Sequence, residues 1–195
     1  MPTWRDAATP AQKEQQLAQT RRILQEFDEK LDENSVLLVN LHFLLAADID
    51  CRTFSHVRYF PDSYETYEVL NACDGLITDY SSVFFDFSIT GKPIVLFMYD
   101  YEDYMAERGM YFDICSLPFT QVFNMEDLKE CIVSGSYRNC RYIEDGEYRN
   151  SFIMHDSVDA AARMNRMLFH DDTRGIEIRD YAHNLDRTWT IAEYR

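Results

Sequence analysis

Short apolar runs of strand length alternate along this chain with segments of helix length, and this alternation restricts the fold more than any other feature. Val36 to Leu41 is a nearly continuous apolar run, which is typical of a strand buried on both faces. The next segments are predicted as strand 57–60, helix 63–73, strand 75–78, helix 81–90 and strand 94–98. These two successive βαβ units predict an α/β fold, a Rossmann-like parallel sheet flanked by helices with right-handed crossovers.

Helices before and after these units complete the expected domain. From Pro10 to about Leu31, apolar residues recur mostly every three or four positions among charges, which indicates an amphipathic helix. A short helix is expected over 125–133, introduced by Asn124, and an apolar-faced helix over 156–169. We therefore predict one Rossmann-like domain over residues 1–169, followed by a charged tail over residues 170–195 whose packing is not predicted.

Several residues are predicted to mark the ends of these helices. Asp62 and Glu65 are spaced as a capping box at the start of the helix after the strand 57–60. Gly91, followed by Pro93, is expected to end the helix 81–90. Gly109 is expected to end a further helix in the same way.

The charge of the chain limits its partners. Nineteen basic residues against 34 acidic ones give a formal net charge of −15 over 195 residues. Such a chain repels nucleic acid and anionic lipid at long range, so we expect no nucleic-acid partner. A phosphate group that it binds must be held locally, by a few cationic side chains and by the N–H groups at helix ends.

Cysteine spacing and apolar content indicate the compartment. The five cysteines, at positions 51, 73, 115, 131 and 140, form no C-x-x-C pair and leave one over, which favours reduced thiols in the cytoplasm over a zinc site or a disulfide framework. No segment approaches the roughly eighteen uninterrupted apolar residues of a membrane span, and the amino-terminus lacks an apolar signal region. We expect a cytoplasmic chain without a membrane-spanning segment.

The stretch from Leu76 to Asp86 is the strongest candidate for a binding site. A short apolar strand runs there into a hydroxyl pair, Ser81-Ser82, that opens an apolar helix. The amino-terminus of a helix presents unpaired N–H groups, for which phosphate is a natural ligand. Spacing alone leaves two readings open, because serine at a helix start is also an ordinary cap.

This stretch resembles the CDP-glycerol glycerophosphotransferase family of teichoic acid synthesis, in its carboxyl-terminal, donor-binding domain. The matching residues are Thr78-Asp79-Tyr80-Ser81-Ser82, followed by Phe84, Phe85 and Asp86. Pro2-Thr3-Trp4-Arg5 is similar to a family segment that follows the first strand of that domain, so the chain is expected to begin late and to lack an amino-terminal domain. His42 after its strand, and Arg108-Gly109 before Tyr111, Phe112 and Asp113, are also similar to the family.

The resemblance implies both a fold and an activity. The fold is that of the carboxyl-terminal half of a glycosyltransferase-B enzyme, and the activity is transfer of glycerol phosphate from CDP-glycerol to a lipid-linked polyol-phosphate acceptor in teichoic acid or related cell-wall or capsule synthesis. The chain would then be part of a transferase, inactive alone and peripheral at the inner face of the cell membrane through parts outside it. The alternatives are a CDP-ribitol or nucleotide-sugar transferase, or a nucleotide-binding fragment without chemistry.

The candidate site residues lie mostly after predicted strands, where ligands bind in open α/β sheets. The resemblance implies His42 as the catalytic residue, although a lone histidine beside an apolar run is also commonly structural. The resemblance and the positions after predicted strands together predict that the donor phosphates and nucleotide are bound by Thr3, Arg5, Pro61, Asp62, Thr78, Asp79, Ser81, Ser82 and Arg108. Arg108 equally fits an ion pair with Glu107 or Asp113. No metal-ligand spacing is visible, and a divalent cation would come with the diphosphate donor or through Asp79.

Overall fold

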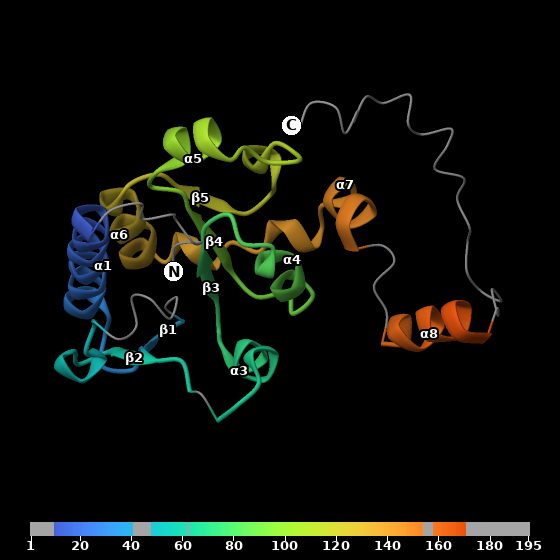
Figure 1. Ribbon diagram of the computed structural model, residues 1–195, viewed down its shortest axis with the longest axis horizontal. Coiled ribbons are helices and arrows are strands. Elements are labelled where there is room, and N and C mark those ends of the chain that lie inside the picture. The colour runs from blue at the N-terminus through green and yellow to red at the C-terminus, as the bar shows by residue number, and fades with distance from the viewer. Residues whose placement is uncertain (1–9, 41–47, 62, 154–157, 171–195) are drawn as a thin grey trace. The chain divides into compact units, whose positions relative to one another are not determined.

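The computed structural model describes residues 10–40, 48–61, 63–153 and 158–170 (Figure 1). The strands are β1 (Leu37–Val39), β2 (Val57–Tyr59), β3 (Leu76–Thr78), β4 (Ile94–Phe97) and β5 (Thr120–Val122). The α-helices are α1 (Pro10–Lys30), α3 (Thr66–Ala72), α4 (Val83–Ser88), α5 (Tyr101–Glu107), α6 (Met125–Ser134), α7 (Gly146–Tyr148) and α8 (Ala160–His170). Short 3-10 turns cover Cys51–Thr53, Ile114–Ser116, Ser136–Arg138 and Arg141–Ile143, and a π-turn covers Arg149–Ile153.

The strands form two parallel sheets within the first of two compact units, Met1–Ile153 and Met154–Arg195. One sheet pairs β1 with β2, and the other has the order β3-β4-β5. All three strand pairs are parallel, with Leu38 opposite Arg58 in the first sheet and Ile77 opposite Val95 in the second. Helices follow the strands, so the predicted parallel α/β architecture is confirmed.

The expectation that the strands 57–60 and 75–78 share one sheet is wrong for the residues described. β2 pairs with β1, whereas β3 pairs with β4. In a doubly wound sheet of order 3-2-1-4-5-6, a central strand joins the two halves. Within the described part of the chain no strand lies in that position, although Leu37 of β1 and Ile77 of β3 pack against the same hydrophobic cluster.

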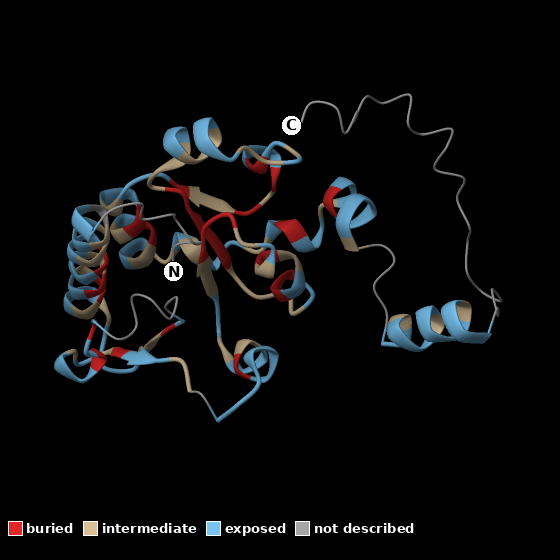
Figure 2. Cartoon of the chain, in the orientation of Figure 1, coloured by how far each residue is buried: buried red, intermediate tan, exposed pale blue. Residues whose placement is uncertain are grey.

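Aromatic side chains dominate the core beside the three-stranded sheet. β4 is buried along its whole length, as Figure 2 shows. Around it lies a cluster of buried residues: Tyr80, Phe84, Phe87, Ile94, Leu96, Met98, Ile114, Leu117, Phe119, Tyr142 and Tyr148. Its three tyrosines have polar partners: the Tyr80 hydroxyl donates to Asp100, the Tyr142 hydroxyl to the carbonyl of Lys92, and the Tyr148 hydroxyl to Ser88 Oγ at 2.8 Å. The last residue of α4, Ser88, is thus bonded to the core, as is Lys92 in the segment that follows the helix.

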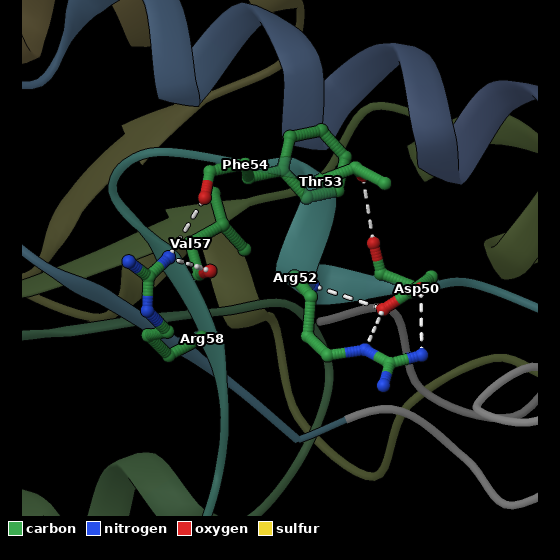
Figure 3. Close-up of polar contacts among 6 residues, drawn as sticks. All are labelled: Asp50, Arg52, Thr53, Phe54, Val57 and Arg58. Atoms are coloured by element: carbon green, nitrogen blue, oxygen red, sulfur yellow. Dashed lines mark hydrogen bonds and ion pairs between the residues drawn. The ribbon is translucent and has the colours of Figure 1, made fainter.

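The two-stranded sheet has a smaller core and more polar ties. Its buried cluster consists of Leu24, Val39, Ile49, Cys51 and Val57. Arg58 on β2 donates hydrogen bonds to the backbone carbonyls of Phe54, Val57 and Ser55 at 2.8–2.9 Å, and Arg52 pairs with Asp50 (Figure 3). These bonds fold the segment before β2 back on the strand.

Helix α1 contacts the cores of both sheets. Leu24 is buried in the cluster of the two-stranded sheet, and Phe27 is buried in a third cluster with Val95 and Leu128. Glu26, next to Phe27 in the sequence, forms an ion pair with Lys129 of α6 at 2.6 Å. The amphipathic helix predicted from Pro10 to Leu31 is therefore confirmed as a scaffold element that joins the two halves of the unit.

The predicted helix ends are confirmed at three positions and wrong at one. Asn124 caps α6 by accepting a hydrogen bond from the Asp127 N–H, and Gly91 and Gly109 follow their helices with φ near +70°. The capping box lies three residues later than predicted, between Glu65 and Glu68 at the start of α3. The helix begins at Thr66 rather than at Ser63, which moves its N-cap to Glu65.

The second unit contains α8 in its described part. The helix begins at Ala160, later than the predicted 156, with residues 154–157 and the tail 171–195 outside the described ranges. Arg163 pairs with Asp159 one turn before it. None of the helices described in either unit is long and apolar enough to cross a membrane.

All five cysteine thiols are free.

Candidate functional site

The chain passes from the protein interior to its surface between β3 and α4. Thr78 ends the strand with 5% of its surface exposed, and Asp79 and Tyr80 are 2% and 6% exposed. Ser81 is half-buried and Ser82 is exposed. Three buried residues thus deliver the serine pair to the carboxyl end of the sheet, where ligands bind in α/β folds.

The serine pair begins α4 without acting as a conventional cap. Ser82 occupies the N-cap position, but its hydroxyl makes no capping hydrogen bond to the helix backbone. The backbone carbonyls of Ser81 and Ser82 accept bonds from the N–H groups of Phe84 and Phe85 at 3.4 and 3.0 Å. Because α4 has only six residues, its dipole is weak, and binding here would depend chiefly on the serine hydroxyls.

Tyr80 connects this turn to the end of the neighbouring strand. Its hydroxyl donates a hydrogen bond to the Asp100 carboxylate at 3.1 Å. Its ring stacks on Tyr104 of α5, with 3.7 Å between the ring centroids and an interplanar angle of 10°. These contacts join the segments that follow β3 and β4. The parallel pairing of the strands predicts that these segments lie near each other, but not which side chains meet.

Arg108 lies at the far end of α5. It is the exposed C-cap residue of that helix, and its backbone N–H donates to the Tyr104 carbonyl at 2.9 Å. Tyr104 is in turn stacked on Tyr80. The structure therefore links Arg108 through α5 to the turn that carries the serine pair.

Asp86, which follows the serine pair in the motif, has a structural partner. The hydroxyl of Tyr67 on α3 donates to its carboxylate at 3.0 Å, and this hydrogen bond raises the pKa of Tyr67. The interaction ties α3 to the first turn of α4. Sequence reasoning had not assigned a contact to either residue.

The other predicted site residues are placed less fully. Thr3, Arg5, His42 and Asp62 lie outside the described residues. Pro61 is half-buried and follows β2, which belongs to the other sheet. The structure thus brings together Thr78 to Ser82 and the α5 segment. The connection that sequence reasoning missed is the one made by Tyr80, Asp100 and Tyr104. The available signal was an acidic residue between β4 and α5.

A cavity of about 560 Å³ lies away from this site, between α1 and the segment 48–54. Acidic side chains dominate its polar lining, including Asp28, Glu29, Asp48 and Asp50. Such a lining repels a diphosphate. Within the described part of the chain, no three His, Cys, Asp or Glu side chains are grouped as a metal ion would require.

Comparison with known proteins gives related sequences and structures. The chain is 38% identical over 100 residues to the teichoic acid glycerol-phosphate primase of Bacillus subtilis (strain 168), covering 51% of this chain and 26% of the relative. It is 36% identical over 77 residues to the teichoic acid ribitol-phosphate primase of Bacillus spizizenii, covering 40% of this chain and 20% of the relative. The chain therefore spans about a quarter of the length of these relatives or less.

Solved structures of the wall teichoic acid polymerase TagF share the fold. A TagF variant soaked with CDPG for 30 minutes matches 87% of this chain and 40% of its own, with a TM-score of 0.65 and 24% sequence identity. This likeness confirms the predicted fold class. The sequence profile of one family matches residues 1–170, most of the chain. The chain belongs to the CDP-glycerol:poly(glycerophosphate) glycerophosphotransferase family.

Proposed function

We propose that this chain is the donor-binding domain of a transferase that moves glycerol phosphate from CDP-glycerol to a hydroxyl of a lipid-linked polyol phosphate. In this reaction the acceptor oxygen attacks the glycerol-bearing phosphorus. The bond from that phosphorus to the bridging oxygen breaks, and CMP leaves. The acceptor site and a further, amino-terminal domain would lie outside this chain, as would any contact with a membrane.

The observation that carries this proposal is that three buried residues deliver the serine pair, with Ser81 half-buried and Ser82 exposed, to the carboxyl end of a parallel sheet. The Ser82 hydroxyl makes no capping bond, which leaves it able to donate to a phosphate oxygen. Hydrogen bonds to charged groups contribute about 1.5–3 kcal/mol each, enough to hold a diphosphate locally in a chain of net charge −15. Family membership supports CDP-glycerol as the donor.

The remaining proposed residues have different tasks. Ser81, Ser82 and Arg108 would contact the donor phosphates, together with Thr3, Arg5, Pro61 and Asp62. Thr78 and Asp79 are buried, so they would act by holding the turn in place. His42 is proposed to take the proton of the attacking hydroxyl or to contact the diphosphate, because imidazole titrates near neutral pH.

Substitution of the serine pair tests the proposal. We expect Ser81→Ala and Ser82→Ala each to weaken CDP-glycerol binding by about ten- to a hundredfold, corresponding to about 1.5–3 kcal/mol, as measured by calorimetric titration. Affinity for glycerol, which has no phosphates, should not change. The matched control is Ser134→Ala at the end of α6, which should leave CDP-glycerol affinity at the wild-type value.

The opposite outcome is equally clear. If the double variant binds CDP-glycerol as the wild type does and only its melting temperature falls, the serine pair is a helix start and the proposed site is wrong. CDP-ribitol should be titrated in parallel because a ribitol-phosphate primase is among the relatives. Tighter binding of CDP-ribitol than of CDP-glycerol would assign the ribitol donor to the same site.

A further inference from the structure

We propose that Tyr80 is a positioning residue that holds the serine turn and Arg108 in the arrangement needed to bind a diphosphate. The inference rests on the proposed function, and it assigns a role to three residues outside the proposed contacts: Tyr80, Asp100 and Tyr104. None of them needs to contact the donor.

The first observation is the direction of the Tyr80 side chain. It belongs to the buried cluster beside β3–β5, whereas the next residue, Ser81, is half-buried and Ser82 is exposed. Phe84, two residues beyond the serine pair, is 1% exposed in the same cluster. The serine turn is therefore attached to the core on both sides, by Tyr80 before it and by Phe84 after it.

The second observation concerns Asp100. It occupies the N-cap position of α5, where aspartate usually accepts a hydrogen bond from a backbone N–H of the helix. Its side chain makes no capping bond and accepts the Tyr80 hydroxyl at 3.1 Å instead. A charge-assisted hydrogen bond to another segment has replaced the local cap.

The third observation is the helical turn that follows. The Asp100 carbonyl accepts the N–H of Tyr104 at 2.9 Å, and the Tyr104 ring stacks on Tyr80. The Tyr104 carbonyl then accepts the N–H groups of Arg108 and Gly109 at 2.9 and 3.2 Å. Tyr80 is thus held at both ends of the first turn of α5, by Asp100 and by Tyr104. Tyr104 also fixes the backbone position of Arg108.

This arrangement affects binding because phosphate recognition depends on donors being in place beforehand. A turn that must be ordered when the donor arrives lowers the affinity by the cost of that ordering. Loss of the Tyr80 hydroxyl would remove the bond from the serine turn to Asp100, while the buried ring stays stacked on Tyr104. The affinity for the diphosphate would fall, whereas contacts to the nucleoside would not depend on this bond.

The test compares Tyr80→Phe with a matched control in the whole chain. Tyr80→Phe removes the hydroxyl and keeps the stacked ring. Tyr148→Phe makes the same chemical change at the opposite end of α4, where the hydroxyl bonds to Ser88. CDP-glycerol and cytidine affinities would be measured by calorimetry, together with melting temperatures. Asp100→Asn, which keeps the size of the partner and removes its charge, serves as the second variant.

We expect Tyr80→Phe and Asp100→Asn to weaken CDP-glycerol binding about five- to tenfold, with cytidine affinity unchanged. Tyr148→Phe should lower the melting temperature without affecting either ligand. The effect of Tyr80→Phe should also be largely lost in a Ser81→Ala, Ser82→Ala background, because the positioned groups are then absent.

Two results would overturn the inference. Unchanged CDP-glycerol affinity in Tyr80→Phe, or equal losses for CDP-glycerol and cytidine, would make Tyr80 a structural residue like Tyr148. A wild-type chain that does not bind CDP-glycerol would instead refute the proposed function, and the positioning role with it.

Discussion

The two parallel sheets of the first unit are stabilised in different ways. The three-stranded sheet packs β4 against a large cluster rich in aromatic residues. The two-stranded sheet buries five residues and depends on polar bonds to the backbone before β2. The candidate site stands on the first of these sheets. A binding turn needs rigid support, and close packing of large side chains provides it better than exposed polar bonds do.

Asp28 shows the polar strategy most clearly. Its carboxylate accepts hydrogen bonds from the N–H groups of Ser55 and His56 at 2.9 and 2.5 Å. Partial burial acts to raise the pKa of Asp28, but the backbone donors of His56, Ser55 and Val57 outweigh it and lower the pKa. One carboxylate on α1 thus satisfies the backbone that leads into β2, a task that a larger apolar core would not perform.

Removal of an aromatic side chain from the larger core should have the largest effect on stability. We expect Phe84→Ala to lower the free energy of unfolding by about 3–5 kcal/mol, because Phe84 is fully buried and contacts the Phe119 ring. Urea denaturation measures the change. Ile89→Ala on the same segment is the control, since Ile89 is 60% exposed, and it should change stability by no more than about 0.5 kcal/mol. Similar losses of unfolding free energy in both variants would contradict the conclusion that the aromatic core stabilises this sheet.

Removal of the Asp28 carboxylate should have an intermediate effect. Asp28→Ala leaves two backbone N–H groups without their acceptor, and we expect a loss of about 1–3 kcal/mol. Hydrogen exchange should accelerate at the amides of Ser55 and His56 but not in β4. The neighbouring variant Glu29→Ala is the control. Equal acceleration of hydrogen exchange in both sheets would show that they unfold as one unit. The two sheets would then not be stabilised independently.

The smallest effect should come from the ion pair between α1 and α6. Hydrogen bonds from Lys129 and Arg22 lower the pKa of Glu26 below its ordinary value of 4.5. A lowered folded-state pKa contributes stability that is present above the unfolded pKa and is lost as the pH falls through the folded pKa. We expect Glu26→Gln to cost less than about 1 kcal/mol at pH 7.

Denaturation of both proteins from pH 7 to pH 3 checks this expectation. The difference in stability between wild type and Glu26→Gln should shrink below about pH 4.5, where the carboxylate of the wild type becomes protonated. A difference that stays constant over the whole range would mean that the charge of Glu26 contributes nothing and that its packing alone matters.

Local sequence patterns predicted most of the secondary structure. An apolar run predicted β4 because this strand is buried along its whole length, and such burial belongs to consecutive residues. Asn124 and Gly91 gave helix ends for the same reason, since a cap bonds to residues only two or three positions away. The capping box was misplaced by three residues because Asp62 and Glu65 have the same spacing as the pair that forms it, Glu65 and Glu68.

The sequence by itself determined the parallel α/β class, the family resemblance, and the position of the serine pair after a buried strand. The tertiary structure alone decided that β2 and β3 belong to different sheets, that the Ser82 hydroxyl makes no cap, and that Asp100 bonds to Tyr80. Periodicity describes which side of an element is apolar, but it does not describe which element lies opposite. The contact between Tyr80 and Asp100 joins residues twenty positions apart, and only the pairing of β3 with β4 brings their side chains within hydrogen-bonding distance.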